Sequence, residues 1–456
     1  MPVLMRNGLG RRGLLARAAG MPALGVIGAA CAVGSGGGPA GEVAPKAQLR
    51  KGAKIVYAID EQGGAARQEL RMAQVKLFQD KFPDIEVELL RGATGTEKLV
   101  SLFAAGTPPD YFRQSVRGMM AFIMRNQVLA LDPYMKRDKY DLSDFFPSAW
   151  EQYRWKGRYY AVPFLGLQIW FYNRAVLQSA GAARPPGTWR DPSWTWDAFL
   201  AACQKVVERG VDENGNQTTT RWGVSLNTGA RGWGPWIWSN GGDVFSADGT
   251  KLVFDQPPAI EAVQFMADLI HKHRLALSIP EAQARGGFDA LFTAGRVGFQ
   301  NIGLNSVIAY RRQPSLAWGL TGAPRGKGKT TASSGGGVGW FIAADSKVRD
   351  ETWEFGKVMV SPEAQRLEAK DSTVASRRSV MNDPTIVNTN DPPGPEIKTL
   401  AEALELLRID TPLINGTEID TILDTHFDAI WTGKQGVTQA ISAAAAQIKP
   451  LLNPPG

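Results

Sequence analysis

Apolar residues recur with alternating periods between residues 54 and 114, and this pattern predicts strands and helices in turn. Short apolar or alternating runs predict β-strands at 54–59, 85–90 and 110–114. Between them, two stretches carry apolar residues at helical spacing, 65–82 and 96–106. Pro83 stops the first helix and Gly106 closes the second. This order of elements predicts a parallel sheet with right-handed crossovers.

The polar residues next to these strands are candidates for a binding cleft. Parallel sheets bind ligands where loops leave the carboxyl ends of their strands. Asp60 and Glu61 directly follow the first strand, and Asp110 precedes the third strand beside Pro108 and Pro109. We therefore expect Asp60, Glu61 and Asp110 to lie at the lip of a cleft.

Three later apolar stretches look like strands that glycine or proline interrupts, at 160–172, 296–303 and 335–344. Proline cannot donate a ladder hydrogen bond, and glycine weakens the interior of a strand. We interpret the three stretches as passages of the chain between two α/β lobes. In the first, residues 163–166 would form a hinge that absorbs dihedral change while the lobes move as rigid bodies.

Composition and charge fit a globular protein of two or three domains. The chain has 456 residues, 44% hydrophobic and 21% charged, with a formal net charge of +7. The first thirty residues hold four arginines and no acid, so the rest of the chain carries about +3. No run of Lys or Arg with interleaved aromatic residues occurs. These features argue against a nucleic-acid partner.

The N-terminus has the pattern of a targeting segment. The stretch "RRGLL" (11–15) resembles a twin-arginine export signal, and "GAAC" (28–31) resembles a lipoprotein cleavage box, although Gly28 departs from the usual branched residue. We expect an export signal over 1–30, a lipidated Cys31 and a flexible Gly/Pro/Ala-rich tether over 31–47. The protein would then lie on the outer face of the cytoplasmic membrane. A soluble secreted protein with an incidental cysteine is the alternative.

Several motifs that suggest other chemistry fail on inspection. Cys203 shares a helical face with apolar residues, so we interpret it as a core residue. The stretch "GLTGAPRGKGKTTAS" (319–333) lacks the first glycine of a phosphate-binding loop at Ala323 and has no helix after it. Three histidines are poorly spaced for a metal ion or a catalytic triad. We expect no metal and no cofactor.

Segments spread over nearly the whole chain resemble a known family. "FQDKFPDIEVEL" (78–89), "WKGRYYAVPF" (155–164), "FTAGRVGF" (292–299) and "GGGVGWFIAADSK" (335–347) occur in the family's order. The family is the extracellular solute-binding proteins of bacterial ABC-type sugar importers, the maltose-binding-protein-like group. An inserted "GTWRDPSW" (187–194) departs from its pattern.

The resemblance implies a two-lobe α/β clamshell of the periplasmic-binding-protein type. Each lobe would hold a mainly parallel sheet flanked by helices, and three hinge crossings would join the lobes. We expect the N-terminal lobe at 48–164 plus 300–339, and the C-terminal lobe at 165–299 plus 340–456.

A sugar site needs flat aromatic rings for the C–H faces and polar groups for the hydroxyls. Trp233, Trp236 and Trp238 stand in a glycine-rich segment that predicts a loop, where each could stack on a sugar or fill the core. The resemblance adds further candidates near the cleft: Asp110, Asn301, Gly336, Gly337, Trp340 and Arg377. Phe164, at the predicted hinge, could line the floor of the cleft.

Our main hypothesis is a monomeric, lipid-anchored carbohydrate receptor that closes on its ligand and delivers it to an ABC permease without chemistry. A glycoside-acting enzyme with a tryptophan-lined cleft is one alternative. A receptor for a phosphorylated polyol, with Arg377 among the groups that hold the phosphate, is another.

Overall fold

The computed structural model describes residues 43–59, 64–93, 95–211, 214–328, 331–371, 374–387 and 396–454. Cys31, Asp60 and Glu61 lie outside these ranges, as do the export signal and most of the tether. The roles expected for them therefore stay predictions. Within the described residues, no helix is long and apolar enough to cross a membrane.

The first sheet contains the predicted strand–helix–strand–helix–strand unit. Its strands are ordered β2-β1-β3-β14-β6, with bounds β2 (Glu86–Leu90), β1 (Lys54–Ala58), β3 (Tyr111–Ser115), β14 (Val338–Ile342) and β6 (Ala161–Phe164). Helices α1 (Gly64–Lys81) and α2 (Thr96–Ala104) follow β1 and β2. Strand β1 is parallel to β2 and β3, which confirms the prediction for this part of the chain.

The second sheet is built from later segments. Its main path is β10 (Ala276–Leu277), β9 (Gln217–Ser225), β11 (Val297–Gly303), β7 (Gln168–Asn173), β13 (Ser333–Ser334) and β15 (Leu407–Arg408). Strand β12 (Trp318–Thr321) pairs with β7, and β8 (Glu208–Val211) pairs with β9. We call the elements around the first sheet the first lobe and those around the second sheet the second lobe.

Both sheets are mixed, whereas we expected mainly parallel sheets. Strand β14 is antiparallel to β3 and β6, and β7 is antiparallel to β11, β12 and β13. The reason is topological. A strand that enters a sheet straight from the other lobe runs against the strands that the βαβ crossovers produce.

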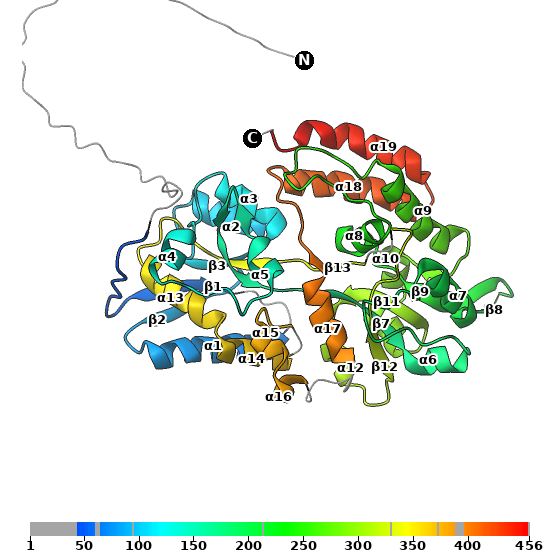
Figure 1. The fold of residues 1–456 in the computed structure, drawn as a ribbon, viewed down its shortest axis with the longest axis horizontal. Helices are drawn as coiled ribbons and strands as arrows, with labels where there is room; N and C mark the ends of the chain where they lie inside the picture. The colour runs from blue at the N-terminus through cyan, green and yellow to red at the C-terminus, as the bar shows by residue number, and fades with distance from the viewer. Residues whose placement is uncertain are drawn as a thin grey trace, which may run out of the picture. The chain divides into compact units, whose positions relative to one another are not determined.

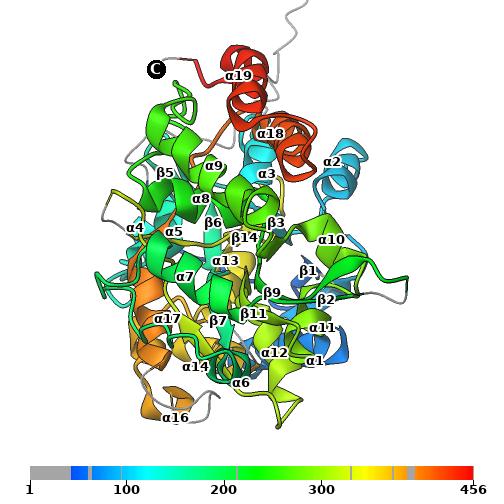
Figure 2. The same cartoon turned by 90° about the vertical axis from the view of Figure 1, so that its right-hand side faces the viewer.

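Helices from distant parts of the sequence cover the two sheets (Figures 1 and 2). Helices α13 (Arg349–Met359) and α14 (Pro362–Asp371) pack on α1 in the first lobe. Helices α18 (Gly416–Trp431) and α19 (Val437–Ile448) lie side by side, and both contact α9 (Pro257–His271) in the second lobe. The C-terminal half of the chain therefore contributes to both lobes.

Two of the three predicted crossings connect the sheets. Residues 165–167 join β6 to β7, and residues 335–337 join β13 to β14. A third passage lies between α16 (Pro384–Val387), which packs on α14, and β15.

The predicted crossing at 296–303 is wrong. Strand β11 stays in the second sheet, between β7 and β9. Its glycine serves packing, since a Cβ built at Gly298 would lie 2.7 Å from Val206 Cγ1. Because this crossing is absent, the lobe boundaries expected at residues 299/300 and 339/340 also differ from those in the structure. Residues 300–303, 318–321 and 333–334 belong to the second sheet, while β14, α13 and α14 belong to the first lobe.

The residues that interrupt the first crossing have two different functions. Pro163 lies in β6, which has one neighbour, β14, in its sheet, so the missing N–H breaks no ladder. Gly166 permits a close approach of the two crossing segments. A Cβ at Gly335 would lie 2.1 Å from the Gly166 carbonyl oxygen, and one at Gly166 would lie 2.8 Å from the Gly336 carbonyl oxygen.

Candidate functional site

The crossings leave each sheet from the edge where its parallel strands end. In the first sheet, Val338 pairs with both Ser115 at the end of β3 and Phe164 at the end of β6. In the second sheet, Gln168 at the start of β7 pairs with Gly303, the last residue of β11. Parallel α/β sheets bind ligands at this edge. The site is therefore expected between the helices that start there.

A pocket of about 350 Å³ opens beside these edges. It lies between α3 (Val116–Ile123), which begins directly after β3, and α8 (Ala230–Ser239), which follows β9. The segment that connects β15 to α18, and α18 itself, complete the wall. Arg117 is the one lining residue from the first lobe among the described residues. The pocket thus joins the two lobes.

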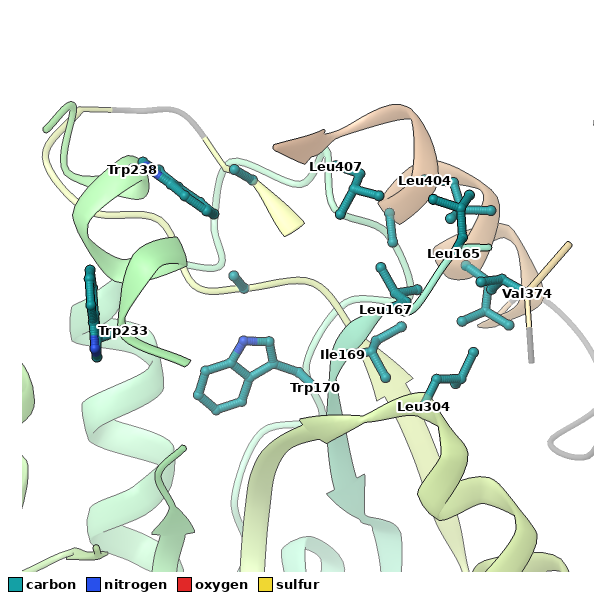
Figure 3. Close-up of a cluster of buried hydrophobic side chains, with 14 of the residues drawn as sticks. Leu165, Leu167, Ile169, Trp170, Trp233, Trp238, Leu304, Val374, Leu404 and Leu407 are labelled. Carbon is teal, nitrogen blue, oxygen red and sulfur yellow. The ribbon is translucent and has the colours of Figure 1, made fainter. Parts of the chain in front are cut away.

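Trp233 and Trp238 of α8 line the pocket together with Phe245. Figure 3 shows both tryptophans as members of a cluster of buried hydrophobic side chains. Trp233 stacks on Phe427 of α18, with ring centroids 4.9 Å apart and an angle of 24°. The Trp238 indole Nε1 donates a hydrogen bond of 3.0 Å to Asp243 Oδ1. Both rings are mostly covered by these neighbours, since Trp233 is 2% exposed and Trp238 is 8% exposed, so only a small part of each borders the pocket.

Charged side chains form the polar part of the wall. Arg117 Nε lies 3.3 Å from Asp410 Oδ2, and Arg117 Nη1 pairs with Asp420. Arg408 Nη2 pairs with Asp243 Oδ2 at 2.5 Å, and its guanidinium lies 5.1 Å from the Trp238 ring centroid. The Arg117 pairs are mostly buried, with side-chain exposures of 25%, 20% and 24% for Arg117, Asp410 and Asp420. They tie the first lobe to the second.

Helix α18 brings a further carboxylate close to this cluster. Asp424 stands one turn after Asp420, and burial raises its pKa, although Arg117 acts in the opposite direction. The main cause is desolvation, which disfavours the charged carboxylate, and the nearby Asp428 carboxylate acts in the same direction. In the described parts of the chain, no group of three His, Cys, Asp or Glu side chains is arranged to hold a metal ion.

A family model described as bacterial extracellular solute-binding protein matches residues 48–366. The chain belongs to this family. The maltotriose-binding protein of Pyrococcus abyssi is 23% identical over 316 residues, which are 67% of this chain and 63% of that protein. Binding proteins of Brucella abortus and Brucella suis are also 23% identical, and this chain spans 65% of their length.

Solved structures of similar proteins share the fold of this solute-binding protein. The substrate-binding protein Lmo0181 of Listeria monocytogenes, in complex with cycloalternan, has a TM-score of 0.73 and 19% identity over 87% of this chain and 98% of its own. UgpB of Mycobacterium tuberculosis, in complex with glycerophosphocholine, has a TM-score of 0.72 and 19% identity over 88% and 98%. The expected family and two-lobe α/β fold are confirmed.

The third tryptophan of the predicted loop lies in the core of the second lobe. The segment is helix α8, which corrects the expected loop. A Cβ at Gly232 would lie 1.9 Å from the Asn227 carbonyl oxygen, so the glycines serve close helix packing. Trp236 is 2% exposed, and its ring centroid lies 5.5 Å from that of Trp170 and 5.6 Å from that of Phe199.

Trp340, Asp110 and Arg377 have structural partners inside the first lobe. Trp340 is buried and stacks on Tyr111 at 5.5 Å. The Asp110 carboxylate accepts hydrogen bonds from Val56 N–H and the Ser346 hydroxyl at the amino end of β3, opposite to the edge that carries the crossings. Arg377 pairs at 3.1 Å with the carboxylate of Asp144, which lies between α4 (Asp132–Arg137) and α5 (Pro147–Glu151).

Phe164, Asn301, Gly336 and Gly337 lie at or beside the crossings. Phe164 is half-buried, with the Arg71 guanidinium 5.6 Å from its ring centroid. Asn301 is buried in β11, and its Oδ1 has no hydrogen-bond partner among the described residues. Gly336 is buried. Gly337 has a packing reason to be glycine, since its Cβ would lie 1.7 Å from Gln152 Oε1.

Sequence reasoning missed the charged half of the pocket: Arg117, Asp243, Arg408, Asp410 and Asp420. Arg117 had a usable signal, because it stands two residues after the carboxyl end of β3, where ligands of such sheets bind. The three aspartates and Arg408 had no such signal in the sequence. They come from three separate segments of the chain, and their meeting depends on how α8, β15 and α18 pack.

Proposed function

We propose that this solute-binding protein is an extracytoplasmic carbohydrate receptor that captures its ligand in the Trp233–Trp238 pocket and delivers it intact to an ABC-type importer. The proposal rests on one observation above the others. A pocket at the carboxyl edges of two sheets, between lobes joined by short crossings, combines indole rings with paired charged groups.

This combination suits a sugar. The parts of Trp233 and Trp238 that border the pocket can contact C–H groups, although both indoles are mostly buried, and the carboxylate and guanidinium groups offer acceptors and donors to hydroxyls. The pocket volume of about 350 Å³ falls in the range of small-ligand sites. The maltotriose-binding protein of Pyrococcus abyssi and the Lmo0181–cycloalternan complex, both similar to this chain, point to an oligosaccharide ligand.

Closure follows from the way in which the lobes are joined. The segments 165–167 and 335–337 are short and lie side by side, so we expect the lobes to move about this region. A ligand that contacts α8 on one side and Arg117 on the other binds the closed arrangement more tightly than the open one. It therefore shifts the population toward the closed form, which a permease can recognise.

The role is binding without chemistry. The three carboxylates that line the pocket are already engaged with guanidinium groups, which leaves none of them poised as a general acid. We also propose that Cys31 is lipidated after removal of the export signal and that the receptor is monomeric and tethered to the outer face of the membrane.

Calorimetry tests the proposed ligand class. The panel contains maltotriose, maltose, cellobiose, an arabino-oligosaccharide, sn-glycerol 3-phosphate, glycerophosphocholine and amino acids. We expect heat of binding from at least one saccharide, and the recovered saccharide should run unchanged on a chromatogram after long incubation. Silence from every saccharide, or binding of a phosphodiester alone, would overturn the proposal, and a cleaved product would point to an enzyme.

A matched pair of variants tests the location of the site. Trp238→Phe removes the indole N–H that holds Asp243 and reduces the stacking surface, so affinity should fall about five- to tenfold. Trp155→Phe, in the β4–β5 hairpin (Arg154–Trp155 and Arg158–Tyr159) of the first lobe, should leave affinity unchanged. Equal affinities for the two variants would remove Trp238 from the site.

A further inference from the structure

Resting on this proposed function, we propose that the pocket selects uncharged and cationic saccharides against anionic ones, and that Asp243, Asp410 and Asp420 set this selectivity. The basis is the balance of charge in the wall. Among the residues that the structure describes, three carboxylates and two guanidiniums line the pocket, and their charges sum to −1. Asp424, one turn along α18 from Asp420, adds to the negative side of the region.

Both guanidinium groups of the pocket wall already form ion pairs with aspartates. Arg117 pairs with Asp410 and Asp420 at once, and Arg408 pairs with Asp243 while it covers the Trp238 ring. An anionic group that approached a free N–H of either guanidinium would also come close to the aspartates paired with it. Repulsion between these carboxylates and the anion would offset its attraction to the arginine, in a wall that is only partly exposed to solvent.

The carboxylates keep capacity for ligands that donate hydrogen bonds. A carboxylate has about four acceptor positions, and each aspartate here uses only some of them on its protein partners. Hydroxyl and ammonium groups can donate hydrogen bonds to the remaining positions. The ionised oxygens of a phosphate or a uronate can only accept hydrogen bonds, so the carboxylates of the wall cannot bind them. The same wall therefore accepts a neutral or amino sugar and repels an acidic one.

The experiment compares saccharides that differ in charge and little else. The probes are cellobiose and maltotriose, their 6-amino-6-deoxy derivatives and their C6-oxidised uronate derivatives, titrated by calorimetry at low and at physiological salt. For whichever backbone binds, we expect the amino form to bind at least as tightly as the neutral form. The uronate form should bind about tenfold more weakly or worse, with a gap that narrows as salt rises.

A charge-removing variant assigns the effect to the wall. In Asp410→Asn/Asp420→Asn, the amides keep the shape and free Arg117, so the uronate-to-neutral affinity ratio should rise by about tenfold or more. Asp428→Asn is the matched control, because it removes one charge from an exposed position of α18 that does not line the pocket. Thermal unfolding of each variant checks that it is folded.

The outcomes separate this inference from the proposed function. A uronate form that binds as tightly as its neutral parent would overturn the inference and leave the carbohydrate receptor intact. An equal uronate-to-neutral affinity ratio in the double variant and in the Asp428→Asn control would also overturn the inference and leave the carbohydrate receptor intact. Silence of every probe, neutral and charged alike, would overturn the proposed function and this inference with it.

Discussion

The close approach of the two crossing segments gives the sharpest prediction, for Gly335→Ala. A Cβ at this position would lie 2.1 Å from the Gly166 carbonyl oxygen and 2.8 Å from Leu407 Cδ1. The first contact is with backbone, so no side-chain rotation can relieve it. The segments 165–167 and 335–337 would have to separate by about 1 Å to reach an ordinary contact, which strains both sheets at once.

The size of the effect follows from two opposing terms. Overpacking of a well-filled site costs about 1–3 kcal/mol, and a backbone contact belongs at the upper end. Alanine also lowers the conformational entropy of the unfolded chain, which raises the free energy of unfolding by about 0.4–1 kcal/mol. We therefore expect Gly335→Ala to lower the free energy of unfolding by about 2 kcal/mol and the melting temperature by about 2 °C.

Urea unfolding followed by tryptophan fluorescence measures this loss, with Gly187→Ala as the control. Gly187 is exposed and a Cβ there would meet nothing within 4 Å, so its substitution should be neutral or slightly stabilising. If Gly335→Ala proves as stable as Gly187→Ala, the crossings do not approach as described, and the hinge argument built on them is refuted.

Four further predictions concern single side chains. Arg117→Ala should raise the dissociation constant about tenfold and enlarge the ligand-free radius of gyration in small-angle scattering, because it unties the lobes. Burial would raise the pKa of Asp138, yet hydrogen bonds from Arg137, Lys357 and Trp353 hold the pKa well below its usual range. Its stabilisation is present above the unfolded pKa of about 4 and is lost as pH falls toward the folded value. Asp138→Asn should thus cost about 2 kcal/mol at pH 7 and progressively less below about pH 5 in urea titrations; a pH-independent loss would contradict this. Burial raises the pKa of the Cys203 thiol, so in a Cys31→Ser background it should resist Ellman's reagent until urea unfolds the protein. Trp340→Ala should destabilise the fold by about 3–5 kcal/mol in the same urea assay; a stable variant would place Trp340 outside the core.

The strand–helix–strand–helix–strand unit of the first lobe could be predicted because its signals are local. The first two strands, Lys54–Ala58 and Glu86–Leu90, lie within a residue of the ranges expected for them. Helix α1 ends at Lys81, one residue before the predicted end of the helix at residue 82. Cys203 is fully buried, as its helical spacing with apolar residues indicated. Period, proline and glycine act within a few residues of each other, so the sequence displays them directly.

Glycine misled the analysis where its role was tertiary. The glycines near Trp233 suggested a loop, yet Gly232 lets helix α8 approach the Asn227 carbonyl. Gly298 suggested a crossing, yet it accommodates Val206 within the second sheet. A glycine marks a position where a side chain does not fit, and the sequence does not tell whether a bend, a ligand or a neighbouring element is the cause.

The sequence by itself determined the local elements, the family and the crossing between the sheets near residues 163–166, because each depends on short-range pattern. Tertiary structure alone decided which tryptophans line the pocket and which fill the core, and it assembled Arg117, Asp243 and Asp420 into one charged wall. These residues stand far apart in the chain. Their juxtaposition is set by the packing of helices across two sheets, and that long-range geometry leaves no periodic trace in the sequence.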